Sequence, residues 1–141
     1  YLINDFGFLK SNFDTMKYGL SIIDIIDKAL PKQYKDHQMF NIAYQCLNKI
    51  NNNEGHKITF LFFLLSFSHH NGYSINNSNF NTFKSEKALD LFMNGNSDND
   101  YKKVINLMEG IDLDQLIKKT LSFIQSYIPE ISYAKSLKFI N

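Results

Sequence analysis

The stretch that decides the fold runs from Ile58 to His70 and reads ITFLFFLLSFSHH. Its apolar side chains leave no continuous polar face, so a helix formed here is stable only where other helices surround it. The apolar run Ile58–Phe67 has about half the length that a helix needs to cross a bilayer. Asn71 and Gly72 then supply a C-terminal stop. We therefore expect the central helix of a bundle and no membrane-spanning segment.

Two amphipathic helices are predicted before this stretch. The first follows Ser11, an N-cap with Asp14 three residues later, and ends at Pro31. Its predicted core positions, at helical spacing, are Met16, Leu20, Ile23, Ile26 and Leu30. The second begins at the Asp36 cap and ends in the asparagine-rich stretch NKINNNEG. Its predicted core face is formed by Phe40, Ala43, Tyr44 and Leu47.

A polar loop and three more helices are predicted after the central stretch. Residues 73–82 are rich in Asn and Ser, which is typical of a loop. Short amphipathic helices are expected over 85–95 and 100–110, and each ends at a glycine. The last helix begins at Asp112, with Gln115 completing a capping box, and stops at Pro129. Its predicted core stripe is Leu116, Leu121, Ile124 and Ile128.

These patterns predict an all-α fold, a compact bundle of about five to six helices around the apolar central helix, without a zinc module. The 44% of hydrophobic residues fits one domain that buries most of its apolar side chains. We assign residues 11–141 to this domain. Residues 1–10 are expected to be a linker from a missing N-terminal domain.

The charge balance excludes a strong overall attraction to nucleic acid. The formal net charge is only +1, and all 15 cationic residues are lysines. Without arginine the chain cannot make bidentate guanidinium contacts to phosphate or guanine. Any DNA binding must therefore come from local lysine patches, and it is expected to be independent of base sequence.

Few residues are candidates for catalysis or metal binding. Cys46 is the single cysteine, so neither a disulfide nor a cysteine pair for zinc can form, and a reducing cytoplasmic setting is predicted. His69 and His70 are neighbours on a helix and point about 100° apart, so they cannot converge on one ion. Asp24 and Asp27 are interpreted as a solvated stripe that faces lysines. We predict no metal, no cofactor and no enzymatic activity.

Lysines gather in the C-terminal part of the sequence. The candidates for DNA binding are Lys118, Lys119, Lys135 and Lys138. Tyr127 and Tyr133 lie near them along the chain and have rings on which bases can stack. A cationic DNA-binding face and ordinary surface lysines that confer solubility are equally compatible with this pattern.

The C-terminal stretch SYIPEISYAKSLKFIN is expected to turn at Pro129 and fold back along the domain, because proline cannot continue a helix. Ordering such a tail costs backbone entropy, so its apolar side chains must be buried. Leu137, Phe139 and Ile140 are predicted to face the core, with Lys135 and Lys138 pointing outward.

Three segments, in order, resemble the C-terminal helical domain of the bacterial recombination mediator RecO. FLKSNFDTMKYGLSIIDIIDKAL is similar to the passage into that domain's first long helix, with Tyr18 and Asp24 at its patterned positions. FLFFLLSFSHHNGY resembles its central helix with the closing Gly-aromatic pair. YIPEISYAKSLKFI is similar to its terminal Lys-Ser-Leu motif, most closely in the Bacteroidota-like form.

The resemblance implies a non-enzymatic mediator that follows an N-terminal OB-fold. Such a mediator binds single-stranded DNA, contacts RecR and the single-strand DNA-binding protein, anneals strands and helps RecA load. The resemblance also implies a slot for the acidic tail of that binding protein beside the central helix. We place the slot near Phe62, Phe67 and Tyr73.

The sequence departs from the family's pattern at two places. The four zinc-binding cysteines of many members are absent, and Leu61 and Phe62 stand where basic residues often open the central helix. A lysine from a neighbouring helix must then replace those basic residues. Two rival interpretations are a helical protein-interaction or regulatory module without a nucleic-acid role and an enzyme whose site needs a partner chain.

Overall fold

The computed structural model describes residues 13–29, 37–51, 55–73, 103, 106 and 110–140. This part of the chain is entirely helical and holds no strand, so the all-α prediction is confirmed. It contains four α-helices, and the predicted number of five to six is not established. The two predicted short helices lie mostly outside the described residues, although Lys103 and Asn106 are helical. The predicted linker over residues 1–10 also lies outside them.

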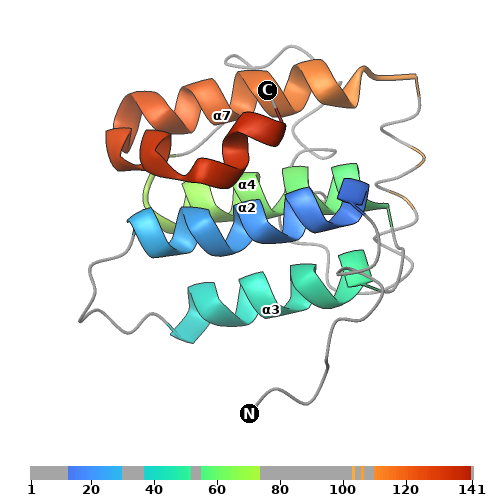
Figure 1. The fold of residues 1–141 in the computed structure, drawn as a ribbon, viewed down its shortest axis with the longest axis horizontal. Helices are drawn as coiled ribbons and strands as arrows, with labels where there is room; N and C mark the ends of the chain where they lie inside the picture. The colour runs from blue at the N-terminus through green and yellow to red at the C-terminus, as the bar shows by residue number, and fades with distance from the viewer. Residues whose placement is uncertain are drawn as a thin grey trace.

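Four α-helices and two short 3-10 helices follow one another along the chain. They are α2 (Phe13–Ala29), α3 (His37–Asn51), α4 (His56–His70), α7 (Leu113–Tyr127), η1 (Pro129–Tyr133) and η2 (Lys135–Phe139). Helices α2, α4 and α7 run in one direction, and α3 runs in the opposite direction (Figure 1). The N-terminal ends of α2, α4 and α7 consequently lie at the same end of the bundle.

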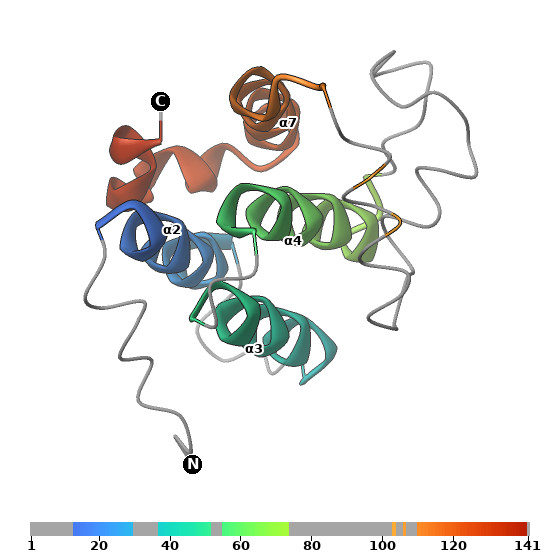
Figure 2. The ribbon, with the colours of Figure 1, turned by 90° about the vertical axis from the view of Figure 1, so that its right-hand side faces the viewer.

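Helix α4 is the centre of the bundle, as the sequence predicts. It packs against α2, α3 and α7, which lie around it in the view along the helix axes (Figure 2). Nine of its fifteen residues are buried, and Phe60, Phe63 and Phe67 have no exposed surface. A helix that is apolar on all sides is stable in water only under such cover.

The buried faces of α2 and α3 differ from the predicted stripes. Leu20 and Ile23 of α2 are exposed, and its core positions are Tyr18, Ile22, Ile25 and Ile26. Phe40 and Tyr44 of α3 are exposed, and its core positions are Met39, Ala43, Cys46 and Ile50. Moving a stripe by one residue turns it by about 100° around the helix. In both helices the predicted stripe and the observed stripe are each apolar. The elements that pack against the helix therefore decide which of the two stripes is buried.

Helix α7 begins and ends at the predicted signals. The Oδ1 atom of the N-cap Asp112 accepts a hydrogen bond from the backbone N–H of Gln115 at 3.2 Å. The helix ends at Tyr127, and Pro129 opens η1 two residues later. Proline suits the first position of a helix and cannot continue the preceding one, which accounts for this boundary.

The C-terminal segment packs back against α2, as predicted. Its buried apolar residues are three apart, Ile131, Ala134 and Leu137, which is the period of a 3-10 helix. Ile140 continues this series, is half-buried and packs against the core. The outward position of Lys135 and Lys138 is confirmed.

The predicted inward position of Phe139 is wrong, because its side chain is 47% exposed. The three-residue period turns Leu137 and Ile140 toward the bundle and leaves Phe139 at the surface.

Candidate functional site

The four lysines predicted to bind DNA come from two elements. Lys118 and Lys119 are exposed on α7, and Lys135 and Lys138 are exposed on η2. Both elements lie on the side of the bundle away from α3 (Figure 1). The structure thus places the four cations on two elements, in two separate pairs.

The α7 pair borders a cleft of about 590 Å³. Its other lining residues are Ile111, Asp112, Gln115, Leu116 and Ser122. From Gln115 to Pro129 the sequence contains two lysines and no carboxylate. One wall of the cleft is therefore cationic, and among the described residues of the lining only Asp112, the cap of α7, is acidic.

The η2 pair lies beside exposed aromatic rings. The Nζ atom of Lys138 is 5.1 Å from the ring centroid of Phe139, a cation–π distance. The Phe139 ring meets Phe13 of α2 edge to face, with centroids 5.6 Å apart. This part of the surface therefore combines a cation, Lys138, with exposed aromatic rings, a combination found in single-strand-binding proteins.

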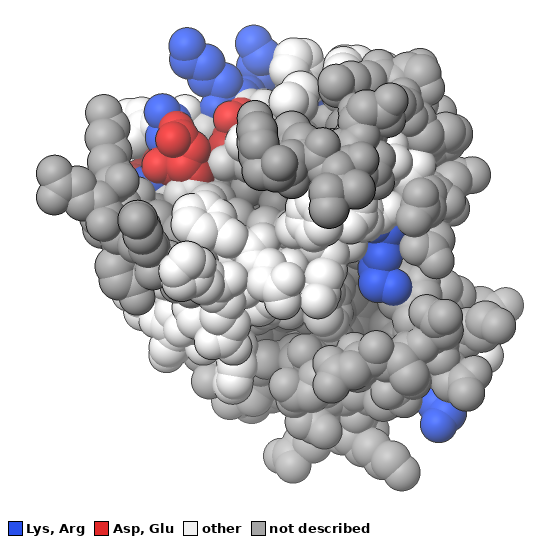
Figure 3. All heavy atoms as spheres, turned by 90° about the horizontal axis from the view of Figure 1, so that it is seen from below, with Lys and Arg blue, Asp and Glu red and all other residues white. Residues whose placement is uncertain are grey.

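The opposite side of the bundle carries little charge. Helix α3 contains one charged residue, Lys49, when histidine is counted as neutral. The view from the α3 side accordingly shows a largely uncharged described surface, with charged atoms toward its edges (Figure 3). Four of the nine described lysines lie on α7 and η2, and the others lie on α2, α3, α4 and at position 103.

A second hollow, of about 470 Å³, lies where α2, α4 and α7 begin. Each of these helices contributes to its lining, which consists of Asp14, Lys17, Tyr18, Gly55, His56, Lys57, Ile58 and Leu113. The Nζ atom of Lys57 is 3.1 Å from Oδ1 of Asp114, and that of Lys17 is 3.9 Å from Oδ1 of Asp14. The hollow is thus lined by cations that are paired with carboxylates of their own domain.

The Tyr18 ring forms the floor of this hollow. It lies against His56 and Phe60, with centroid distances of 5.3 and 5.2 Å. Burial raises the pKa of Tyr18 to about 12, and the carboxylates of Asp114 and Asp14 add to the rise. Burial also lowers the pKa of His56, with a smaller contribution from the neighbouring Lys57. Both rings are therefore uncharged at neutral pH.

The three residues of the predicted partner slot differ in their exposure. Phe67 has no exposed surface and belongs to the core, so this residue offers a partner nothing to touch. Phe62 and Tyr73 are half-buried, and their positions along the chain differ by eleven residues. That separation is about 16 Å along a helix axis. Contact of a partner with Phe62 or with Tyr73 stays a prediction.

Sequence reasoning missed the hollow formed by Lys17, Tyr18, His56 and Lys57. Its residues come from separate helices, so no spacing within one segment of the sequence predicts that they lie together. One signal was nevertheless present in the sequence, because the basic residue Lys57 directly precedes the apolar stretch that begins at Ile58.

Metal-ligating side chains do not gather in the described part of the chain. Within those residues no group of three His, Cys, Asp or Glu side chains lies close enough to hold an ion. His69 is exposed and His70 half-buried at the end of α4. None of the described helices is long and apolar enough to span a membrane.

A comparison with protein families identifies the domain. The family model described as recombination protein O C terminal matches residues 10–82, more than half of the 141-residue chain. The chain belongs to this RecO family. The RecO match covers α2, α3 and α4, and α7, η1 and η2 follow it. No curated protein and no solved structure matches the chain significantly. Membership of the RecO family implies a role in DNA repair and recombination.

Proposed function

We propose that this domain is the non-enzymatic helical part of a cytoplasmic recombination mediator. It binds single-stranded DNA, contacts the single-strand DNA-binding protein and RecR, anneals complementary strands and helps RecA load. The observation that carries the DNA-binding part is the pair of exposed lysine doublets on α7 and η2. Lys118 and Lys119 are exposed on α7, and Lys135 and Lys138 are exposed on η2, whereas the only charged residue of α3 is Lys49.

The lysines act as point charges on the phosphate backbone. A lysine ammonium has no planar fork that could distinguish bases, so the binding is blind to sequence. Each phosphate that a lysine neutralises releases a bound counterion, and affinity therefore falls as the salt concentration rises. Blindness to sequence suits a mediator, which must act on whichever strand has been exposed.

Salt-dependent binding to an oligothymidylate tests this role. Each contacting lysine adds about 0.7 to the slope of log affinity against log salt on single strands. Replacing Lys118 and Lys119 together by Ala should lower that slope by about 1.4, and so should the pair Lys135 and Lys138. Lys49→Ala removes the one charged residue of α3; it is the control and should leave the slope unchanged. If neither double variant differs from the control, the lysines do not contact DNA.

The hollow at the start of α4 is the proposed docking place for an acidic peptide tail of the single-strand DNA-binding protein. Lys17 and Lys57 line it, and the half-buried Ile58 and Leu113 supply apolar surface within it. An incoming carboxylate has to compete with Asp114 for Lys57 and with Asp14 for Lys17. We therefore expect weak, salt-sensitive binding of the peptide.

Titration with a short peptide that is acidic and ends in an aromatic residue tests the docking place. Lys17→Ala with Lys57→Ala should abolish binding at low salt. Lys28→Ala is the matched control, because Lys28 is an exposed cation near the other end of α2 and has its own carboxylate partner, Asp27, at 3.7 Å. Equal binding by the double variant and the control would place the tail elsewhere.

A further inference from the structure

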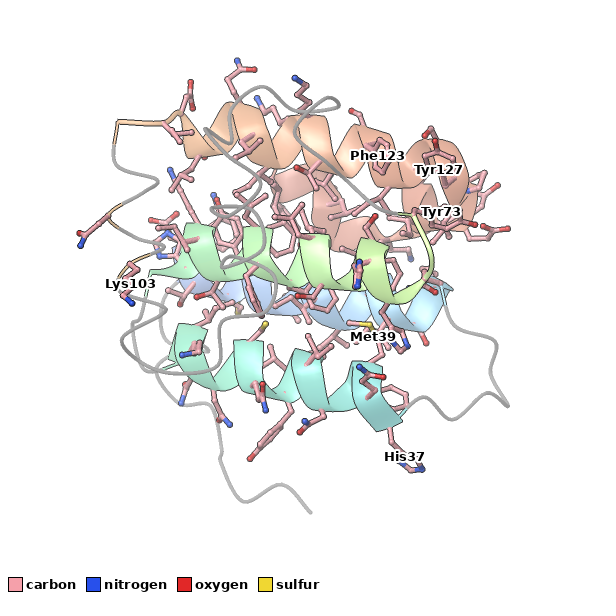
Figure 4. The ribbon with its side chains drawn as sticks, turned by 180° about the vertical axis from the view of Figure 1, so that it is seen from behind. His37, Met39, Tyr73, Lys103, Phe123 and Tyr127 are labelled. Carbon is pink, nitrogen blue, oxygen red and sulfur yellow. The ribbon has the colours of Figure 1, made fainter. Side chains whose placement is uncertain are left out.

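Three aromatic rings from two distant parts of the chain form a surface cluster at the C-terminal end of α7. The rings of Tyr73 and Tyr127 stack with centroids 4.6 Å apart and planes inclined by 22°. Phe123, one turn earlier on α7, meets Tyr127 edge to face at 5.0 Å. Figure 4 shows the three side chains together at one end of the molecule. We refer to Tyr73, Phe123 and Tyr127 as the aromatic cluster.

The backbone holds Tyr73 in place for this contact. Helix α4 ends in a Schellman motif, in which Gly72 has a φ of +86° and its N–H donates to the carbonyl of His69 at 3.0 Å. The N–H of Tyr73 donates to the carbonyl of Ser68 at 2.9 Å, and the Ser68 hydroxyl donates to the carbonyl of Tyr73. Tyr73 is thus fixed on both of its backbone groups before it meets α7.

The aromatic cluster is not a closed part of the core. Tyr127 is 50% exposed even though Tyr73 covers one of its faces, and Phe123 and Tyr73 are only half-buried. Rings used only for packing lie inside, as Phe60, Phe63 and Phe67 do in this bundle. A preformed stack with half of one ring open to solvent is a surface that another flat ring can extend.

The aromatic cluster continues the cationic surface of α7. Lys119, Phe123 and Tyr127 are spaced four residues apart, so they lie along one side of the helix. Eight residues of helix separate Lys119 from Tyr127, or about 12 Å. That is the length of about three nucleotides of a stacked strand. The carboxylates that flank this stretch along the chain are Asp114, five residues before Lys119, and Glu130, three residues after Tyr127.

We propose that the aromatic cluster is a stacking platform for unpaired nucleobases of single-stranded DNA. A base extends the stack on the exposed part of Tyr127, and the strand then runs along α7 so that its phosphates pass Lys119 and Lys118. This assignment rests on the proposed function, because it requires that the domain binds single strands. It adds that bases, and not only phosphates, contribute to the affinity, and it gives Tyr73 a role in DNA contact.

The test compares oligothymidylate with an abasic strand of equal length, which keeps the phosphates and lacks the bases. The full chain should bind the thymidylate strand about 5- to 150-fold more tightly, the effect of stacking one base on an aromatic ring. Tyr127→Leu should remove most of this preference while binding of the abasic strand stays unchanged. Tyr127→Phe keeps the ring and should retain the preference. Tyr44→Leu, an exposed tyrosine on the α3 side, is the matched control.

The possible outcomes separate this proposal from the one on which it rests. Equal binding of both strands by the unmodified chain overturns the stacking platform and leaves the lysine contacts in place. A preference that survives in Tyr127→Leu also overturns it. Binding of neither strand overturns the proposed DNA-binding function itself. Because the strand comparison uses the unmodified chain, it is decisive even if Tyr127→Leu fails to fold.

Discussion

The carboxylate of Asp24, on α2, holds the C-terminal segment through Ser136, and removing it should loosen that segment. The Oδ2 atom of Asp24, on α2, accepts a hydrogen bond from the backbone N–H of Ser136 at 3.2 Å. The same oxygen accepts a second bond from the Ser136 hydroxyl. Ser136 is buried, so in Asp24→Ala its backbone donor would lose its partner away from bulk water.

The expected magnitude follows from these two bonds. A hydrogen bond to a charged acceptor contributes about 1.5 to 3 kcal/mol. The two bonds share one oxygen of a half-buried carboxylate, so we expect a loss of about 2 kcal/mol for the pair. Alanine has a higher helix propensity than aspartate, which offsets up to about 0.7 kcal/mol of this loss in stability.

Asp27→Ala is the matched control, because it makes the same exchange three residues later in α2. Asp27 is exposed and pairs only with Lys28 in the interactions described here, at 3.7 Å. Exposed pairs of this kind contribute about 0 to 1 kcal/mol. Since the gain in helix propensity is common to both variants, Asp24→Ala should be less stable than Asp27→Ala by about 2 kcal/mol.

Urea denaturation followed by circular dichroism measures this difference. Ser136→Ala and the double variant with Asp24→Ala complete a cycle, and a coupling energy of about 0.5 to 3 kcal/mol is expected for groups in contact. If Asp24→Ala and Asp27→Ala unfold within about 0.5 kcal/mol of each other, the carboxylate does not hold the C-terminal segment, and burial of Ile131 and Leu137 must do so alone.

Three further predictions concern the core and the titrating groups. Phe63→Ala should cost about 3 to 5 kcal/mol in denaturant unfolding, whereas Phe40→Ala, on the exposed side of α3, should cost less than about 1 kcal/mol. Because the pKa of His56 is lowered in the folded state, the unfolded chain takes up the proton first; stability is therefore lost as the pH falls through 6.5, and His56→Gln should show a smaller loss. Burial raises the pKa of Cys46 to about 12, so a thiol reagent at pH 8 should modify it only at the rate of unfolding, and rapid labelling of the native protein would contradict its buried position.

The parts of the fold that could be predicted from sequence are those with local causes. Helix α4 is apolar on every side, and only burial makes such a helix stable in water, so its central place follows from the sequence. Asp112 and Pro129 act within a few residues and set the limits of α7. The core faces of α2 and α3 have no such local cause. Each helix has two overlapping apolar stripes, and the contacts with other elements select between them.

The candidate site was only partly predictable for the same reason. Lys118 and Lys119 are visible as a doublet in the sequence, and their exposure follows from the core stripe of α7. The hollow near Lys57 needs the starts of three helices to meet, and the aromatic cluster needs Tyr73 to reach a helix whose Tyr127 lies 54 positions later in the chain.

Tyr73 illustrates how tertiary contacts change the interpretation of a residue. In the sequence it is the aromatic residue after the glycine that ends the central helix, and the resemblance to the RecO family implied a partner slot there. In the structure the Schellman motif turns it toward α7, where it stacks on Tyr127. Its ring therefore lies against α7, the helix that carries Lys118 and Lys119. The proposed peptide site at Lys57 lies at the start of α4, and the proposed base stack at Tyr73 lies beyond its other end, about 20 Å away along the helix. The proposed path of the strand, past Lys119 and Lys118, runs along α7 back toward its start, where Leu113 and Asp114 border the proposed peptide site. The two proposed sites therefore approach each other along α7.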